Sequence, residues 1–146
     1  MSAVQIRDIL NSLRNFYVQL AERFASEQEN VSDQQLPYLL EYIATHEKLL
    51  AAGIQNFAES ADAGLLNTWL QFGAGQTLEQ ILNQIDLHEG MSKYDILTKA
   101  LNADGQLIAL YEGLAAESSA PQVQELFGSL ASMQEARERQ LARAIR

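Results

Sequence analysis

Apolar residues recur every three or four positions along the chain, which is the spacing of one face of an α-helix. The first such stripe is Ile6, Leu10, Leu13, Tyr17, Leu20 and Phe24, and the second is Leu36, Leu40, Ile43, Glu47, Leu50, Ile54 and Phe57. These stripes predict one helix over residues 3–26 and another that ends near Ser60. Ser2 suits the N-cap of the first helix, while Ser32 and Gln35 form a capping-box pattern before the second.

Two further stripes follow in the second half. One consists of Ile96 or Leu97, Ala100, Leu101, Asp104, Leu107, Ile108, Tyr111 and Leu114, and the other of Val123, Leu126, Phe127, Leu130, Gln134, Arg137 and Leu141. The third helix is predicted to begin at Ser92. The fourth is predicted to begin near Pro121, because proline fits the first position of a helix. Strand-like alternation is scarce, so the predicted fold class is all-α.

The second half repeats the first. Tyr17, Leu20 and Ala21 recur 94 residues later as Tyr111, Leu114 and Ala115. Leu36, Leu39, Leu40, Ile43, Ala44 and Ile54 recur 87 residues later as Val123, Leu126, Phe127, Leu130, Ala131 and Leu141. Each half is therefore predicted to be a helical hairpin, over residues 3–60 and 92–146, with a turn seven residues longer in the first.

The connection over residues 61–91 is long. Within it, the segment TLEQILNQIDLHEG predicts a short extra helix over residues 77–88, opened by Thr77 and Gln80 and ended by Gly90. About 30 residues suffice to run the ~40 Å length of a neighbouring helix. A four-helix bundle with one such crossover has the ferritin-like arrangement. The length of 146 residues predicts a single domain, 1–146.

Charge and composition exclude several classes of function. The net charge of −9 argues against binding to nucleic acid or to an anionic membrane surface. The absence of cysteine excludes disulfides and thiolate metal sites. No apolar run approaches the ~20 residues that span a bilayer, and the segment MSAVQIRDIL lacks the pattern of a signal peptide. We expect a soluble cytoplasmic protein.

The second predicted hairpin contains short sequence patterns that suggest a family. They are Leu110-Tyr111 followed by Leu114-Ala115, and, after Pro121, Leu126-Phe127 followed by Leu130-Ala131. This hairpin resembles the rubrerythrin-type branch of the ferritin-like superfamily, and the first hairpin carries a weaker version of the same patterns. The resemblance implies a ferritin-like four-helix bundle.

The resemblance also implies where a dimetal site would lie. In that family each hairpin supplies a Glu seven residues before a helical Tyr, and a Glu-x-x-His in the next helix. These positions hold Leu10, Glu47 and Leu50 in the first hairpin, and Asp104, Gln134 and Arg137 in the second. Because arginine cannot be deprotonated to bind a metal, we expect no dimetal site, no cofactor and none of the family's oxidase, peroxidase or iron-storage chemistry.

The polar replacements fall on apolar stripes, where an unpaired charge would be costly. We expect Arg137 to bridge Glu47 and Asp104 while Gln134 completes the hydrogen bonds; the alternative is that Arg137 extends to solvent. Tyr17 and Tyr111, equivalent by the repeat, are expected in the core with their hydroxyls bonded to polar neighbours. The predicted remnant of the dimetal site comprises Glu47, Asp104, Gln134, Arg137, Tyr17 and Tyr111.

Two alternatives stay open. The first is a divergent iron or manganese oxidoreductase with a displaced site, drawn from Glu41, His46, Glu47 and Asp104. The second is a small-anion binder that uses the pocket between the helices around Arg137. His88 is expected to be a capping or surface residue. No phosphate-binding loop and no catalytic triad is recognisable.

The sequence therefore favours a non-catalytic, metal-free ferritin-like protein that acts as a structural or protein-interaction module, as a homo-oligomer or with a protein partner. The crossover offers an apolar interface if it is not covered by the bundle, and the alternative is a strap packed on the helices. Its residues are Leu65, Leu66, Trp69 and Phe72.

Overall fold

The computed structural model describes residues 3–26, 36–71, 74–88 and 90–143. These residues form six helices and one two-stranded sheet, so the predicted all-α class is confirmed. The chain divides into two compact units, Met1–Ser92 and Lys93–Arg146. In the described part of the chain, no helix combines the length and the apolarity needed to cross a membrane.

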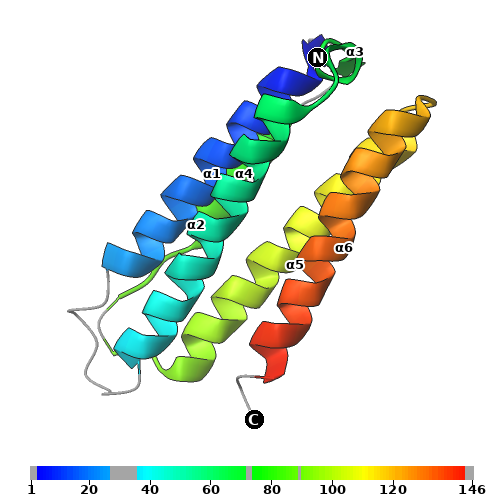
Figure 1. The fold of residues 1–146 in the computed structure, drawn as a ribbon. Coiled ribbons are helices and arrows are strands. Elements are labelled where there is room, and N and C mark those ends of the chain that lie inside the picture. The colour runs from blue at the N-terminus through cyan, green and yellow to red at the C-terminus, as the bar shows by residue number, and fades with distance from the viewer. Residues whose placement is uncertain (1–2, 27–35, 72–73, 89, 144–146) are drawn as a thin grey trace. The chain divides into compact units, whose positions relative to one another are not determined.

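The first unit is built on a hairpin of two antiparallel helices, α1 (Ile6–Ser26) and α2 (Leu36–Ser60) (Figure 1). Each helix buries most of its predicted stripe because the apolar side chains recur at helical spacing. On α2, however, Leu50 is half-buried and Phe57 is 39% exposed. The buried residues of this stripe on α1 are Ile6, Leu10, Leu13, Tyr17, Leu20 and Phe24, and those on α2 include Leu40, Ile43, Glu47 and Ile54. The end of α2 at Ser60 agrees with the sequence, whereas the expected capping box of Ser32 and Gln35 lies outside the described residues.

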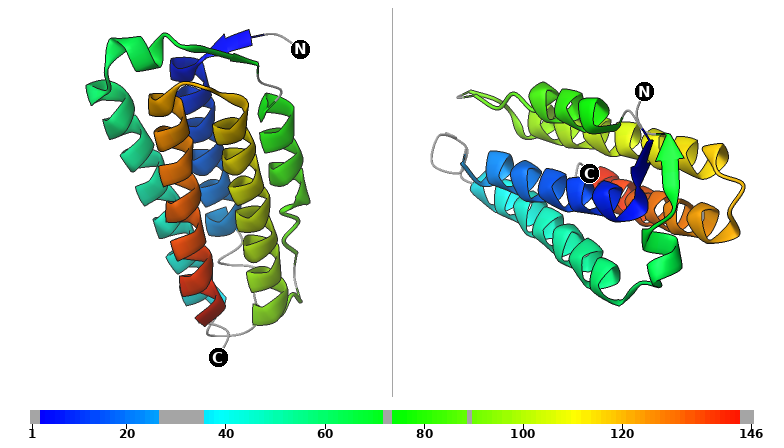
Figure 2. Two further views of the ribbon diagram at one scale, coloured as in Figure 1. Left: turned by 90° about the vertical axis from the view of Figure 1, so that its right-hand side faces the viewer. Right: turned by 90° about the horizontal axis from the view of Figure 1, so that it is seen from above.

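The predicted start of the first helix at residue 3 is wrong. Residues Ala3–Gln5 form a strand, β1, which pairs antiparallel with β2 (Trp69–Gln71) and places Val4 opposite Leu70 (Figure 2). The backbone N–H of Ile6 also donates to the carbonyl of Thr68 at 2.9 Å. The crossover thus takes up the backbone groups that an earlier helix start would have used, and α1 begins at Ile6. The expected N-cap, Ser2, lies outside the described residues.

The crossover contains α3 (Ala63–Leu66), β2 and α4 (Ala74–Gln84). The short helix expected over 77–88 exists, but it starts and ends earlier. Thr77 is therefore an interior residue rather than a cap, and Gly90 adopts a φ of 90° in the turn before the second unit. The apolar face of α4, formed by Leu78, Ile81 and Leu82, is buried, and α4 packs on α1.

The crossover residues proposed as an interface do not act as one surface. Leu65 and Leu66 are buried at 8% and 9% exposure, as is Leu70 in β2. Trp69 is 62% exposed, since alternate residues of a strand point to opposite sides. Phe72 lies outside the described residues. The burial of Leu65 and Leu66 agrees with the alternative of a packed strap, and Trp69 alone of the four is shown on the surface.

The second unit is a hairpin of α5 (Lys93–Glu117) and α6 (Pro121–Arg143). The helix α5 begins directly after Ser92, and α6 begins at Pro121 as predicted. The turn between them is short, and the carbonyl of Ala120 accepts from the N–H of Val123 and that of Gln124, both at 3.1 Å. The repeat is visible in the burial pattern: Tyr17 of α1 and its counterpart Tyr111 of α5 are both 0% exposed.

Candidate functional site

The core of the second hairpin contains three polar side chains. Asp104 lies on the apolar stripe of α5, and Gln134 and Arg137 lie three residues apart on α6, so that they share one face of that helix. Their exposures are 1%, 0% and 5%, respectively. The alternative in which Arg137 extends to solvent therefore does not describe this structure.

The three side chains form a cluster around one carboxylate, here called the Asp104 cluster (Asp104, Gln134 and Arg137). The Gln134 Nε2 group donates a hydrogen bond of 2.6 Å to Asp104 Oδ1. The guanidinium of Arg137 is close enough to act on the carboxylate electrostatically, and it favours the ionised form. Both α6 residues thus stabilise negative charge on the single α5 carboxylate.

Burial of Asp104 disfavours the ionised carboxylate by more than Arg137 and Gln134 favour it. Desolvation raises the pKa of Asp104 from 3.8 to about 7, against the lowering effects of Arg137 and of the Gln134 hydrogen bond, and with a further raising effect from Glu138. Among the described residues Asp104 Oδ2 has no hydrogen-bond partner. Since Oδ1 accepts from Gln134, Oδ2 is the oxygen that takes up the proton. The carboxyl group therefore exchanges a proton near neutral pH inside the core.

The donor set of the Asp104 cluster does not suit a metal ion. It offers one carboxylate, one neutral amide and one permanent cation, and the guanidinium would repel a metal. Within the described ranges no three or more His, Asp or Glu side chains are grouped closely enough to hold one. The displaced site suggested by Glu41, His46, Glu47 and Asp104 draws on both units, so it stays a prediction. The ring of His46 lies 4.4 Å from that of Tyr42, and His88 is exposed.

The remaining residues of the expected site belong to the cores of their own hairpins. Glu47 is 2% exposed on α2, and Leu10 is 1% exposed on α1. Tyr17 packs edge-on against Phe16, with ring centroids 5.4 Å apart. Tyr111 is fully buried on α5, two turns after Asp104. Leu10 and Asp104 are counterparts in the repeat, so one hairpin carries an apolar residue where the other carries the carboxylate.

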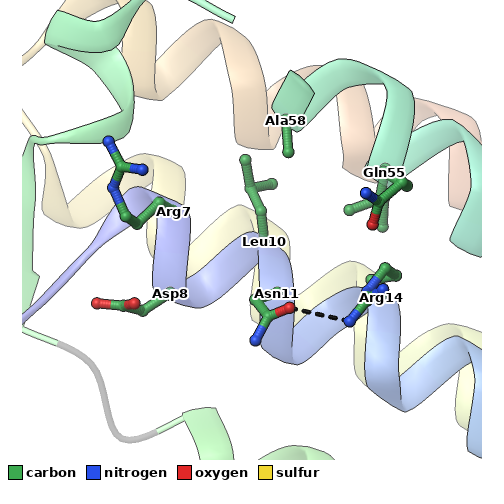
Figure 3. A pocket seen from close by; sticks show the side chains of 8 residues that line it. Arg7, Asp8, Leu10, Asn11, Arg14, Gln55 and Ala58 are labelled. Carbon is green, nitrogen blue, oxygen red and sulfur yellow. Dashed lines mark hydrogen bonds between the residues drawn. The ribbon is translucent and has the colours of Figure 1, made fainter. Parts of the chain in front are cut away.

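Sequence reasoning missed a second polar site, a groove between α1 and α2 with a volume of about 290 Å³ (Figure 3). Its lining residues are Arg7, Asp8, Leu10, Asn11, Arg14, Ile54, Gln55 and Ala58. The signal that could have revealed it is the spacing of Arg7, Asn11 and Arg14, which recur four and three residues apart and so share one side of α1.

Comparison with protein-family models, curated proteins and solved structures finds no match to this chain. Its function is therefore inferred from the two polar sites themselves, from the repeat and from the exposed surface.

Proposed function

We propose that this protein is a metal-free, non-catalytic helical scaffold of the ferritin-like type, in which a structural polar cluster replaces a dimetal site. The observation that carries the proposal is the buried hydrogen bond between Gln134 and Asp104, with Arg137 beside it. These three residues stand where the second hairpin of the rubrerythrin-type branch carries metal ligands. The two matched hairpins and the long crossover support the same bundle arrangement.

The chemistry of the replacement explains why a metal is not needed. A buried carboxylate requires a compensating cation, which a metal ion supplies in a metalloprotein. Arg137 supplies a permanent positive charge from within the chain, and Gln134 supplies a directed donor. The cluster joins one residue of α5 to two of α6, so it also favours a single register of this hairpin.

The outward face of α2 carries the surface through which the scaffold acts. Tyr38, Tyr42 and Leu49 lie on the side of α2 opposite its buried stripe, and they are 75%, 41% and 63% exposed. Phe57, the last residue of the predicted stripe, is 39% exposed and adds apolar surface near the end of the helix. We call these four residues the α2 stripe. An amphipathic surface helix normally carries polar residues on such a face, so the stripe indicates an interaction surface.

A second copy of this chain is the partner that the α2 stripe fits. Aromatic side chains bury roughly 150–250 Å² each, so the exposed fractions of the stripe correspond to roughly 400 Å² of apolar surface. A standard interface buries about 800 Å² per partner, of which a little over half is apolar. The stripe thus supplies about the apolar area that a dimer needs. A two-fold dimer places the same patch on both subunits, and an apolar helix face is complementary to itself.

Addition of ferrous iron or Mn²⁺ to the purified protein tests the metal-free assignment. We expect the melting temperature to be the same with either ion and with a chelator, because a ligand raises stability only if it binds the folded state. Ferrous iron should oxidise in air at the rate of the buffer alone. A saturable rise in melting temperature, or oxidation of iron faster than in buffer, would overturn the proposal and favour the divergent oxidoreductase.

A further inference from the structure

The groove between α1 and α2 lies within the first hairpin and shares no residue with the Asp104 cluster. Its floor is apolar, formed by Leu10 of α1 with Ile54 and Ala58 of α2. In Figure 3, Leu10 points from α1 toward Ala58, with Arg7 on one side and Arg14 on the other. The groove therefore has an apolar middle and a guanidinium group toward each end.

Both arginines of the groove donate hydrogen bonds to side-chain amides. Arg7 donates to the amide oxygen of Asn67 at 2.7 Å. Arg14 donates through the same nitrogen to the amide oxygens of Asn11 at 3.1 Å and Asn15 at 3.0 Å. In the part of the chain that the structure describes, neither guanidinium forms an ion pair, although the net charge of the protein is −9.

Arg14 leaves most of its hydrogen-bond donors unused. A guanidinium carries five N–H donors in a fixed fork, and only one nitrogen of Arg14 is engaged. Its Nε is buried and has no hydrogen-bond partner among the described residues, and a buried donor without a partner calls for an explanation. Turning this side chain toward a ligand would break two bonds to neutral amides and no ion pair. An anion would then receive the paired donors that the protein leaves unused.

The repeat shows that the polar lining is not a general feature of these hairpins. The counterparts of Arg7, Asn11 and Arg14, 94 residues later, are Leu101, Gly105 and Ile108. The counterpart of Gln55, 87 residues later, is Ala142. Both hairpins keep their buried stripes at equivalent positions. The polar side chains at the positions of Arg7, Asn11, Arg14 and Gln55 are therefore confined to the first hairpin, and the helical hairpin does not require them.

We propose that this groove binds a small organic oxyanion, with its charged group on Arg14 and a short apolar body over Leu10, Ile54 and Ala58. A carboxylate or a phosphate matches the fork of a guanidinium. The volume of about 290 Å³ lies at the small end of ligand pockets. Asp8 also lines the groove, at the end near Arg7, and its negative charge favours the Arg14 end for the anion (Figure 3). Gln55 forms part of the wall of the groove, and its Nε2 group donates a hydrogen bond of 2.7 Å to Oε1 of Glu59 on the same helix.

Titration of the full chain with benzoate and with phenyl phosphate, followed by NMR of backbone amides and arginine Nε–H groups, tests this binding. Sodium chloride keeps the ionic strength constant, and benzyl alcohol supplies the same apolar ring without the charge. We expect saturable shifts at Arg14 Nε–H and at the amides of Leu10 and Asn11 with one or both anions, and none with benzyl alcohol. Comparing the two anions shows whether the groove takes a carboxylate or a phosphate.

Two variants of equal charge locate the site. Arg14→Gln should weaken binding at least about tenfold, because it removes a charge-assisted contact. Arg23→Gln, on the same helix but outside the groove, should leave binding unchanged. Equal weakening in both variants, shifts away from α1 and α2, or no binding by the wild-type chain would overturn the proposal. If Arg14→Gln does not fold, the Arg14→Lys variant and the map of shifts in the wild-type chain decide the question.

Discussion

The side chains of Gln134 and Asp104 meet in the core of the second hairpin, where Gln134 Nε2 donates to Asp104 Oδ1 at 2.6 Å. Both side chains are at most 1% exposed. The bond joins α5 to α6 and leaves Asp104 Oδ2 to take up a proton. The stability of the fold should therefore depend on both partners and on pH.

Replacing Gln134 by leucine keeps the volume but removes the donor. We expect Gln134→Leu to lower the free energy of unfolding by roughly 1.5–3 kcal/mol above pH 7, because a buried charged acceptor loses its hydrogen bond. Urea denaturation measures the change. Gln140→Leu, at an exposed position of the same helix, is the matched control. Equal stability of Gln134→Leu and the wild-type chain would show that the hydrogen bond is unimportant.

The raised pKa of Asp104 predicts a specific dependence of stability on pH. Because the folded state holds this proton up to a pKa of about 7, against 3.8 for the ordinary group, the folded state binds more protons between these values. The free energy of unfolding should thus fall as pH rises from about 4 to about 7, and this contribution should be constant above and below. About three pKa units correspond to at most roughly 4 kcal/mol.

Asp104→Asn isolates that contribution, since asparagine does not titrate. The difference in unfolding free energy between Asp104→Asn and the wild-type chain should grow in favour of the variant between pH 4 and pH 7. Asp86→Asn removes an exposed carboxylate and should show little such trend. Parallel stability curves for Asp104→Asn and the wild-type chain across this range would contradict the assignment.

Arg137 should stabilise the fold mainly when Asp104 is ionised. We expect Arg137→Met to cost roughly 3–5 kcal/mol above pH 7, because it removes the cation beside a buried carboxylate, and less near pH 5. Adding Asp104→Asn should recover part of the loss, since the two residues act on each other. Thermal and urea unfolding at the two pH values measure these effects. Arg139→Met, at an exposed position, should change stability by less than about 0.5 kcal/mol. The same loss at both pH values would point to packing rather than charge.

The α2 stripe predicts weak self-association. Sedimentation equilibrium should detect a dimer, and Leu49→Glu should weaken it at least about tenfold because a charge would be buried against an apolar face. Val18→Glu introduces the same charge at an exposed apolar position on α1 and serves as the control. A wild-type chain that is monomeric at about 1 mM would rule out the dimer.

The helix boundaries that the sequence predicted well are those with strong local signals. Ser92 precedes α5, and Pro121 opens α6, because these residues suit the first positions of a helix. The pairing of Ala3 with Gln71 had no such signal. Three-residue strands are too short to show alternation, and their partners lie far apart in the chain. The start of α1 was misplaced for that reason.

The two polar sites also differ in how strongly the sequence signals them. The stripe pattern placed Asp104, Gln134 and Arg137 on the apolar faces of their helices, and all three are buried. The hydrogen bond expected of Gln134 is present, with Asp104 as its acceptor. The raised pKa of Asp104 depends on desolvation, which spacing does not contain. The sequence did not predict the groove around Arg14, because its polar residues flank the apolar stripe and resemble an ordinary solvated face. Comparing the two hairpins position by position is the sequence test that would have found it.

Elemental analysis of the full chain tests most directly the claim that a polar cluster has replaced the metals. The protein should be expressed in medium supplemented with iron and manganese, and purified without chelators or a histidine tag. We predict less than about 0.1 metal ion per chain, because the Asp104 cluster supplies its own cation and lacks a ligand set. One or two tightly bound iron or manganese ions per chain would contradict the account.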